Sequence, residues 1–159
     1  MSREQGPSRV MIVVIAAIAL LATAMPLPRW ISVVRPDFVL LTVLWLCVMA
    51  PRSASLMFAF LCGLAVDAFT GLILGENAFA LVTVAYLASK FHLRIRMFPL
   101  GHQTLTVLSL AWLHQFVLFW IDGVAGHPVT DWMRWLPVMT GAATWPLLSG
   151  VYARLLVRR

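Results

Sequence analysis

Long runs of apolar residues, separated by short polar connections, dominate this 159-residue sequence. Hydrophobic residues make up 62% of the chain and charged residues 11%, whereas an ordinary soluble domain is about 25% charged. A soluble fold of this length buries only about 70% of its surface, so its interior could not hold this much apolar side chain. The sequence therefore predicts an all-α integral membrane protein that forms one polytopic domain.

Six of these runs are candidate membrane-spanning helices, because about 20 helical residues cross a hydrocarbon core of ~30 Å. We expect a bundle of about six spans, at approximately residues 10–27, 38–50, 56–74, 77–89, 105–121 and 136–157. The first run also resembles a signal peptide, since Ala22-Thr23-Ala24 places small residues near its end. A retained helix is the preferred interpretation, because the apolar run continues to Pro26 without a polar start to a mature chain.

The distribution of basic residues predicts the topology, because cytoplasmic loops hold the excess of Lys and Arg. With six spans and a cytoplasmic N-terminus, most basic residues fall on the inner side. The inner set is Arg3, Arg9, Arg52, Lys90, Arg94, Arg96, Arg154, Arg158 and Arg159, and the outer set is Arg29, Arg35 and Arg134. Omitting the second span would move the Lys90 cluster outside. We therefore expect a multi-pass protein with both termini in the cytoplasm.

Asp67 is the one acidic residue within a predicted span. A charge at that depth costs at least ~2.5 kcal/mol, so its side chain should face the protein and have a partner. Counting the helical rise from the cytoplasmic side places four polar residues at comparable depth. They are His114, the first choice, and then Gln115, Tyr86 and Thr144. We expect a structural hydrogen bond between Asp67 and one of them, with a proton or ligand site as the alternative.

Gly63, Asp67, Gly71 and Gly75 recur every four residues and would form one stripe along a helix. Glycine at this spacing lets a neighbouring backbone approach closely. The stripe therefore predicts a helix–helix seam, which is either internal to the bundle or a docking groove for a partner.

Polar residues that flank the spans have simpler interpretations. Asp37 follows Arg35 and Pro36 and should cap the N-terminus of the second helix.

Arg94 and Arg96 belong to a basic inner connection at residues 90–103. Topology and attraction to anionic lipid explain this connection, and docking of a cytoplasmic partner is the alternative. A second polar connection is expected at residues 122–135. Several tryptophans are expected at the outer interface, namely Trp30, Trp120, Trp132 and Trp135.

Motifs for chemistry are missing from the sequence. There is no phosphate-binding Gly-Lys-Ser loop, nucleophile elbow, paired-Cys motif or His-Glu metal motif. Cys47 and Cys62 lie in apolar runs and are expected to be core residues. We therefore expect neither enzymatic activity nor a cofactor or bound metal.

The residues themselves leave two rival functions open. A small-molecule-binding transporter subunit would need a polar outward cavity near Asp67 and Glu76. An enzyme that acts on lipid-linked substrates would need converging acids on the outer side, where the available residues are Asp37, Glu76, Asp122 and Asp131.

Five segments resemble the pattern of the rod shape-determining MreD family. The longest runs from Gly63 to Ala78 and includes Asp67, Gly71 and Gly75. The others are Arg35-Pro36-Asp37, Tyr86-Leu87, Arg96-Met97-Phe98-Pro99 and Trp145-Pro146. The resemblance covers essentially the whole chain.

The resemblance implies a non-catalytic scaffold or regulatory subunit of the bacterial cell-elongation machinery, located in the cytoplasmic membrane. The implied partners are an MreC-like single-span protein, an MreB-like actin homologue, a RodA-like glycosyltransferase and a class B penicillin-binding transpeptidase. The implied fold is similar to the substrate-binding subunits of ECF transporters.

Overall fold

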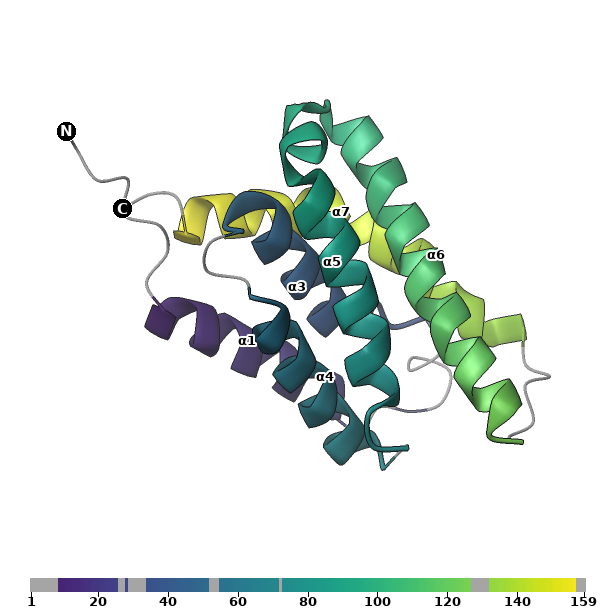
Figure 1. Cartoon of the computed structure of the whole chain (residues 1–159). Helices are drawn as coiled ribbons and strands as arrows, with labels where there is room; N and C mark the ends of the chain where they lie inside the picture. Colours follow the sequence, from purple (N-terminus) through teal and green to yellow (C-terminus); the bar gives the residue numbers. More distant parts are fainter. Residues whose placement is uncertain are drawn as a thin grey trace.

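Six α-helices follow the six apolar runs of the sequence (Figure 1). The computed structural model describes residues 9–25, 28, 34–51, 55–71, 73–126 and 132–156. The helices are α1 (Arg9–Ala24), α3 (Phe38–Met49), α4 (Leu56–Thr70), α5 (Glu76–Met97), α6 (Leu100–Val124) and α7 (Leu136–Leu156). A 3₁₀ turn, η1 (Trp132–Trp135), leads directly into α7. No strand occurs in these ranges, and the all-α class is confirmed.

Some residues used in the topology argument lie outside the described residues. These are Arg3, Arg29, Trp30, Arg52, Asp131, Arg158 and Arg159, together with the side chain of Arg9.

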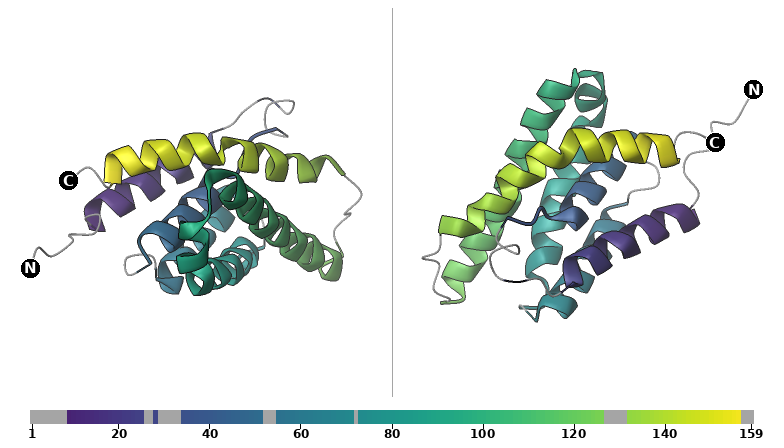
Figure 2. Two further views of the ribbon diagram at one scale, coloured as in Figure 1. Left: turned by 90° about the horizontal axis from the view of Figure 1, so that it is seen from above. Right: turned by 180° about the vertical axis from the view of Figure 1, so that it is seen from behind.

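Helix α3 lies at the centre of the bundle, where it contacts α5, α1 and α7. Figure 2 shows α1 and α7 on one side of it and α4 and α5 on the other. Ten of its 12 residues, from Val39 to Val48, are buried. The sequence of α3 is apolar on every face, which is the pattern of a helix enclosed on all sides. Protein rather than lipid therefore covers α3, which at ~1.5 Å per residue is only about 18 Å long.

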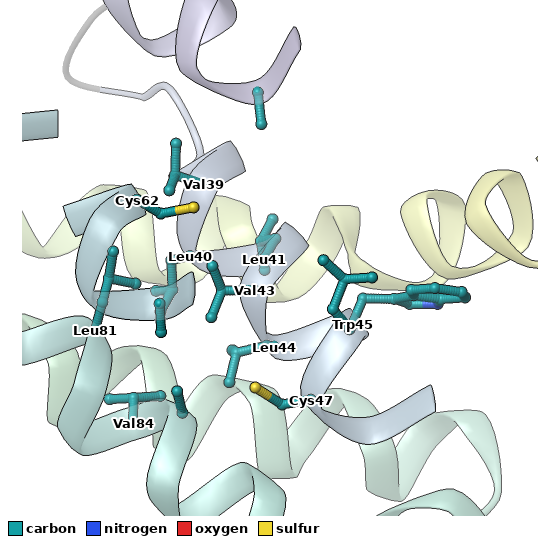
Figure 3. Packing of buried hydrophobic residues seen from close by; sticks show 14 of the residues in the cluster. Val39, Leu40, Leu41, Val43, Leu44, Trp45, Cys47, Cys62, Leu81 and Val84 are labelled. Atoms are coloured by element: carbon teal, nitrogen blue, oxygen red, sulfur yellow. The ribbon is translucent and has the colours of Figure 1, made fainter. Parts of the chain in front are cut away.

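The core around α3 consists mainly of aliphatic side chains, among which Figure 3 also shows Trp45. Cys47 and Cys62 are buried there with free thiols, as the sequence predicts. The rings of Trp45 and Tyr152 meet edge to face, with centroids 5.4 Å apart. The Tyr152 hydroxyl also lies 2.8 Å from the Thr42 hydroxyl, within hydrogen-bond distance. This contact fixes the C-terminal half of α7 against α3.

Helices α5 and α6 form a long hairpin that extends beyond the predicted spans (Figure 1). The expectation of a polar connection over residues 90–103 is wrong, because α5 continues to Met97 and α6 starts at Leu100. Lys, Arg, Leu and Met are good helix formers, so charge ends the apolar run without ending the helix. Pro99 ends it instead, since the residue before a proline avoids the helical region, and Phe98 has ψ 145°.

Two described helices, Glu76–Met97 and Leu100–Val124, are long and apolar enough to cross a membrane by themselves. Three further apolar helices are shorter, namely Val10–Ala24, Phe38–Met49 and Leu56–Thr70.

Candidate functional site

The Asp67 carboxylate joins α4 to the start of α5. Oδ2 accepts a hydrogen bond from the Gly75 backbone N–H at 2.8 Å. Oδ1 accepts from the backbone N–H of Asn77 at 3.0 Å and from its side-chain Nδ2 at 2.9 Å. Asp67 is 1% exposed. Because the first N–H groups of a helix have no partner within that helix, Asp67 caps α5 from the neighbouring helix.

These contacts replace the partners that the sequence suggested. The hypothesis of a hydrogen bond from Asp67 to His114, Gln115, Tyr86 or Thr144 is wrong. Asp67 lies in the last turn of α4, whereas the Tyr86 side chain is exposed and the Thr144 hydroxyl donates to the Gly141 carbonyl at 3.0 Å. The prediction estimated membrane depth from the helical rise and treated residues 56–74 as one continuous helix. It missed Asn77 because α4 ends at Thr70 and the following turn brings Asn77 back to Asp67.

Gly63 provides close contact between α4 and α5. A Cβ added at Gly63 would collide with Cα of Ala78 and lie 2.6 Å from its backbone nitrogen. Glycine is therefore required by the approach of the α5 backbone. At this position the stripe is an internal seam, and the α5 backbone occupies the space that a docked partner would need.

Gly71 and Gly75 have a different role from Gly63. Gly71 ends α4 with φ 67°, and Gly75 precedes α5 with φ 104°. L-residues with a Cβ adopt such left-handed conformations at a cost, so glycine is favoured at both positions. A Cβ at either residue would meet no atom within 4 Å. These two glycines therefore form the turn that brings Gly75 and Asn77 to Asp67, and they do not continue the helical stripe.

A cavity of about 290 Å³, including its open mouth, lies between the start of α3, the middle of α6 and the first turns of α7. Its polar lining consists of Asp37, His114 and Gln115. Its apolar lining consists of Leu40, Leu41, Ala111, Pro137, Val138 and Gly141. This α3–α6–α7 cavity is a polar site within the bundle and is separate from Asp67.

Asp37 occupies the position that the sequence predicted for it. It is the N-cap of α3, and its Oδ1 accepts a hydrogen bond from the Leu40 N–H at 3.0 Å. Arg35 lies two residues before it and donates from Nη1 to the Met25 carbonyl at 3.1 Å, which ties the start of α3 to the end of α1. His114 faces the cavity from α6 and is 3% exposed. Its Nε2 has no hydrogen-bond partner among the described residues.

An aromatic strip covers the C-terminal half of α6 and reaches η1. It consists of Trp112, Phe116, Phe119, Trp120 and Trp135. Trp112 and Phe116 stack with centroids 5.7 Å apart and an interplanar angle of 10°. The Trp135 ring lies 5.3 Å from Trp112 and 6.3 Å from Phe119. The strip exposes a pre-arranged aromatic surface, of which the sequence predicted only Trp120 and Trp135 at an interface.

Charged residues mark the two ends of the α5–α6 hairpin. Arg94 and Arg96 are exposed in the last turn of α5, beside the exposed side chains of Met97 and Phe98. Cations there complement the C-terminal end of the helix dipole. At the other end, Arg134 of η1 forms an ion pair with Asp122 of α6 at 2.6 Å. The predicted polar connection over residues 122–135 therefore includes a specific contact that joins α6 to η1.

A family model described as rod shape-determining protein MreD matches residues 2–155. The chain belongs to the MreD family. It is 26% identical over 129 residues to the rod shape-determining protein MreD of Haemophilus influenzae, a match that covers 81% of this chain and 80% of that protein. No solved structure matches the chain.

Membership in the MreD family gives this chain a role in cell-shape determination through the rod-shape machinery. MreD proteins are shape-determining proteins of bacterial membranes, and the resemblance noted in the sequence is confirmed. The comparisons provide no support for the transporter alternative. Within the described part of this MreD-family chain, no group of three His, Cys, Asp or Glu side chains is placed to hold a metal ion.

Proposed function

We propose that this chain is a non-catalytic membrane scaffold and regulatory subunit of the machinery that synthesises peptidoglycan during cell elongation. It positions an MreC-like single-span protein relative to an MreB-like actin homologue, a RodA-like glycosyltransferase and a class B penicillin-binding transpeptidase. The chain crosses the cytoplasmic membrane six times with both termini inside. Family membership supports the role in cell shape, and the excess of Lys and Arg on one side supports the orientation.

The aromatic strip on α6 is the observation that carries the scaffold role. Four aromatic residues share one face of α6, because Phe116, Phe119 and Trp120 follow Trp112 by four, seven and eight residues. Trp112 is 50% exposed and Trp120 is 62% exposed. Rigid aromatic side chains are enriched at protein interfaces and among the residues that contribute most to binding. We assign the strip as the surface that binds the single-span partner.

The depth of the strip separates this assignment from an ordinary aromatic belt. Belts lie at the level of the lipid headgroups, and Trp120 near the end of α6 fits that position. Trp112 lies 12 residues before Val124, the last residue of α6, which corresponds to about 18 Å along the helix. The strip therefore reaches the middle of a spanning α6. A partner helix that packs along it would gain contact at every turn, which is the basis of helix association in lipid.

The test is co-purification from the native membrane with the double substitution Trp112→Ala and Phe116→Ala. Loss of an interface anchor costs about 2 kcal/mol or more. We expect recovery of the MreC-like protein to fall by at least about tenfold. Phe79→Ala is the matched control, because Phe79 is a similarly exposed aromatic residue on α5. The control should retain the partner and the rod shape of the cells.

Unchanged recovery of the partner in the double variant, at equal protein level, would reject the strip as the docking surface. If the synthases and the MreC-like protein were absent even from the unmodified preparation, the scaffold role itself would be rejected. Retention of rod shape by cells that produce only the double variant would also count against it.

A further inference from the structure

The α3–α6–α7 cavity contains polar groups that the scaffold role leaves unused. Asp37 lies at the N-terminus of α3, and within the described residues its side chain accepts one hydrogen bond, from the Leu40 N–H. His114 is 97% buried, since 3% of its surface is exposed, and its Nε2 lacks a partner in the same part of the chain. Gln115 adds a half-buried amide to the same wall.

These three groups share one chemical property, which is that each can accept a hydrogen bond. An ionised carboxylate is an acceptor only, and the Gln115 side chain presents a carbonyl oxygen. Nε2 of a neutral imidazole accepts when the proton is on Nδ1. His114 is the buried member of the three, and buried polar groups are normally satisfied, so its unpaired Nε2 at the cavity wall marks a place for a ligand group. The ligand must therefore supply several donors from one small group.

We propose that this cavity binds a primary ammonium group. Such a group has three N–H donors, which matches the three acceptors of Asp37, His114 and Gln115. Its positive charge compensates the Asp37 carboxylate, and the apolar lining that includes Leu40, Leu41 and Val138 accommodates a short alkyl stem. The source is either a small soluble amine or the headgroup of an aminophospholipid, because both present the same chemistry.

Other occupants fit the cavity less well. A water molecule carries no charge, so it leaves the Asp37 carboxylate uncompensated. Hard divalent cations prefer several carboxylate or carbonyl oxygens, and Asp37 is the only carboxylate among the described residues that line the cavity. A quaternary ammonium group has the charge but no N–H donor. This last difference provides a chemical control.

The test uses the full chain in nanodiscs of phosphatidylcholine, with the thermal unfolding midpoint as the readout. Ethanolamine is the probe, and choline is the control that lacks N–H donors. We expect ethanolamine to raise the midpoint in a saturable manner and choline to leave it unchanged. In discs that contain phosphatidylethanolamine, a raised midpoint without added amine identifies the lipid as the source. A response to free ethanolamine alone identifies a soluble amine.

Variants decide whether the cavity is responsible for the effect. Asp37→Asn retains an N-cap residue while it removes the charge, and His114→Leu removes an acceptor. Each should weaken the ethanolamine response at least tenfold, and Gln115→Met provides a third variant if either fails to fold. Ser109→Ala is the matched control, because Ser109 is exposed on α6 and its hydroxyl donates only to the Leu105 carbonyl.

The proposal is overturned if neither ethanolamine nor phosphatidylethanolamine shifts the midpoint. It is also overturned if choline acts equally well or if the response survives in the cavity variants. None of these results depends on the partner that docks on the aromatic strip, so the outcome is independent of the proposed function.

Discussion

Two aspartates lie at helix N-termini in this protein, and they differ in how many donors the chain supplies to them. Asp67 reaches across from α4 and receives three hydrogen bonds at the start of α5. Asp37 caps its own helix and receives one recorded hydrogen bond, from Leu40. The first carboxylate is enclosed by protein, and the second faces a cavity that also contains His114.

The comparison shows that a buried acid cannot be assigned a role from its burial alone. Asp67 is the more deeply buried residue, yet the chain itself fills three positions of its acceptor capacity, as in a structural cap. Asp37 and His114 retain such capacity, although no membrane-depth argument singles out Asp37. The number of donors that the chain itself provides separates the structural acid from the candidate binding acid.

The largest effect is expected when the Asp67 carboxylate is removed. Asp67→Leu leaves the N–H groups of Gly75 and Asn77 without acceptors, and each unsatisfied buried group costs about 1–3 kcal/mol. We expect a loss of at least about 3 kcal/mol in the free energy of unfolding. Asp67→Asn retains one carbonyl acceptor and should lose roughly half as much. Thermal unfolding in detergent measures both, and equal tolerance of the two variants would show that Asp67 is not a cap.

An intermediate effect is expected at the seam that holds α4 against the start of α5. Gly63→Ala places a methyl group against the Ala78 backbone, which cannot move like a flexible side chain. Such overpacking typically costs about 1–3 kcal/mol. Gly150→Ala is the control, because a Cβ there meets nothing within 4 Å. The control should be neutral or slightly stabilising, and an equal loss in both variants would contradict the seam.

The smallest effect on stability is expected in the cavity. His114→Leu replaces a buried imidazole whose Nε2 lacks a partner with an apolar side chain, and such a change is nearly neutral or stabilising. We expect the free energy of unfolding to change by less than about 1 kcal/mol, while the ethanolamine response is lost. A destabilisation as large as that of Asp67→Leu would mean that His114 is a structural residue, and the contrast between the two sites would fail.

The helical class and the six apolar segments follow from hydropathy, and charge distribution supplies a topology. The capping role of Asp37 also follows from its position after Arg35 and Pro36. The helical class, the helical segments and the Asp37 cap are confirmed, because they depend on local sequence, and the topology stays a prediction. The helical extension to Met97 was missed, because a fall in hydropathy was treated as the end of the helix.

Contacts between helices were predicted less well. Asp67 was expected to be buried and partnered, which the structure confirms, but its partners are Gly75 and Asn77 rather than His114. The error came from treating the four-residue recurrence of glycine as helical. Gly71 and Gly75 have positive φ values and form a turn. The cavity beside His114 depends on how α3, α6 and α7 pack, and sequence spacing contains no information about that arrangement.

The short central helix α3 has a consequence for how the protein is made. It leaves the ribosome before α5 and α7, yet its surroundings are completed by those later helices. In the six-span topology proposed above, this 18 Å segment would enter a hydrocarbon layer of ~30 Å before they are made, and the length mismatch would be unfavourable. We therefore expect α3 to remain with the insertion machinery until α5 has been synthesised. Its release into lipid would then follow its own synthesis by two helices.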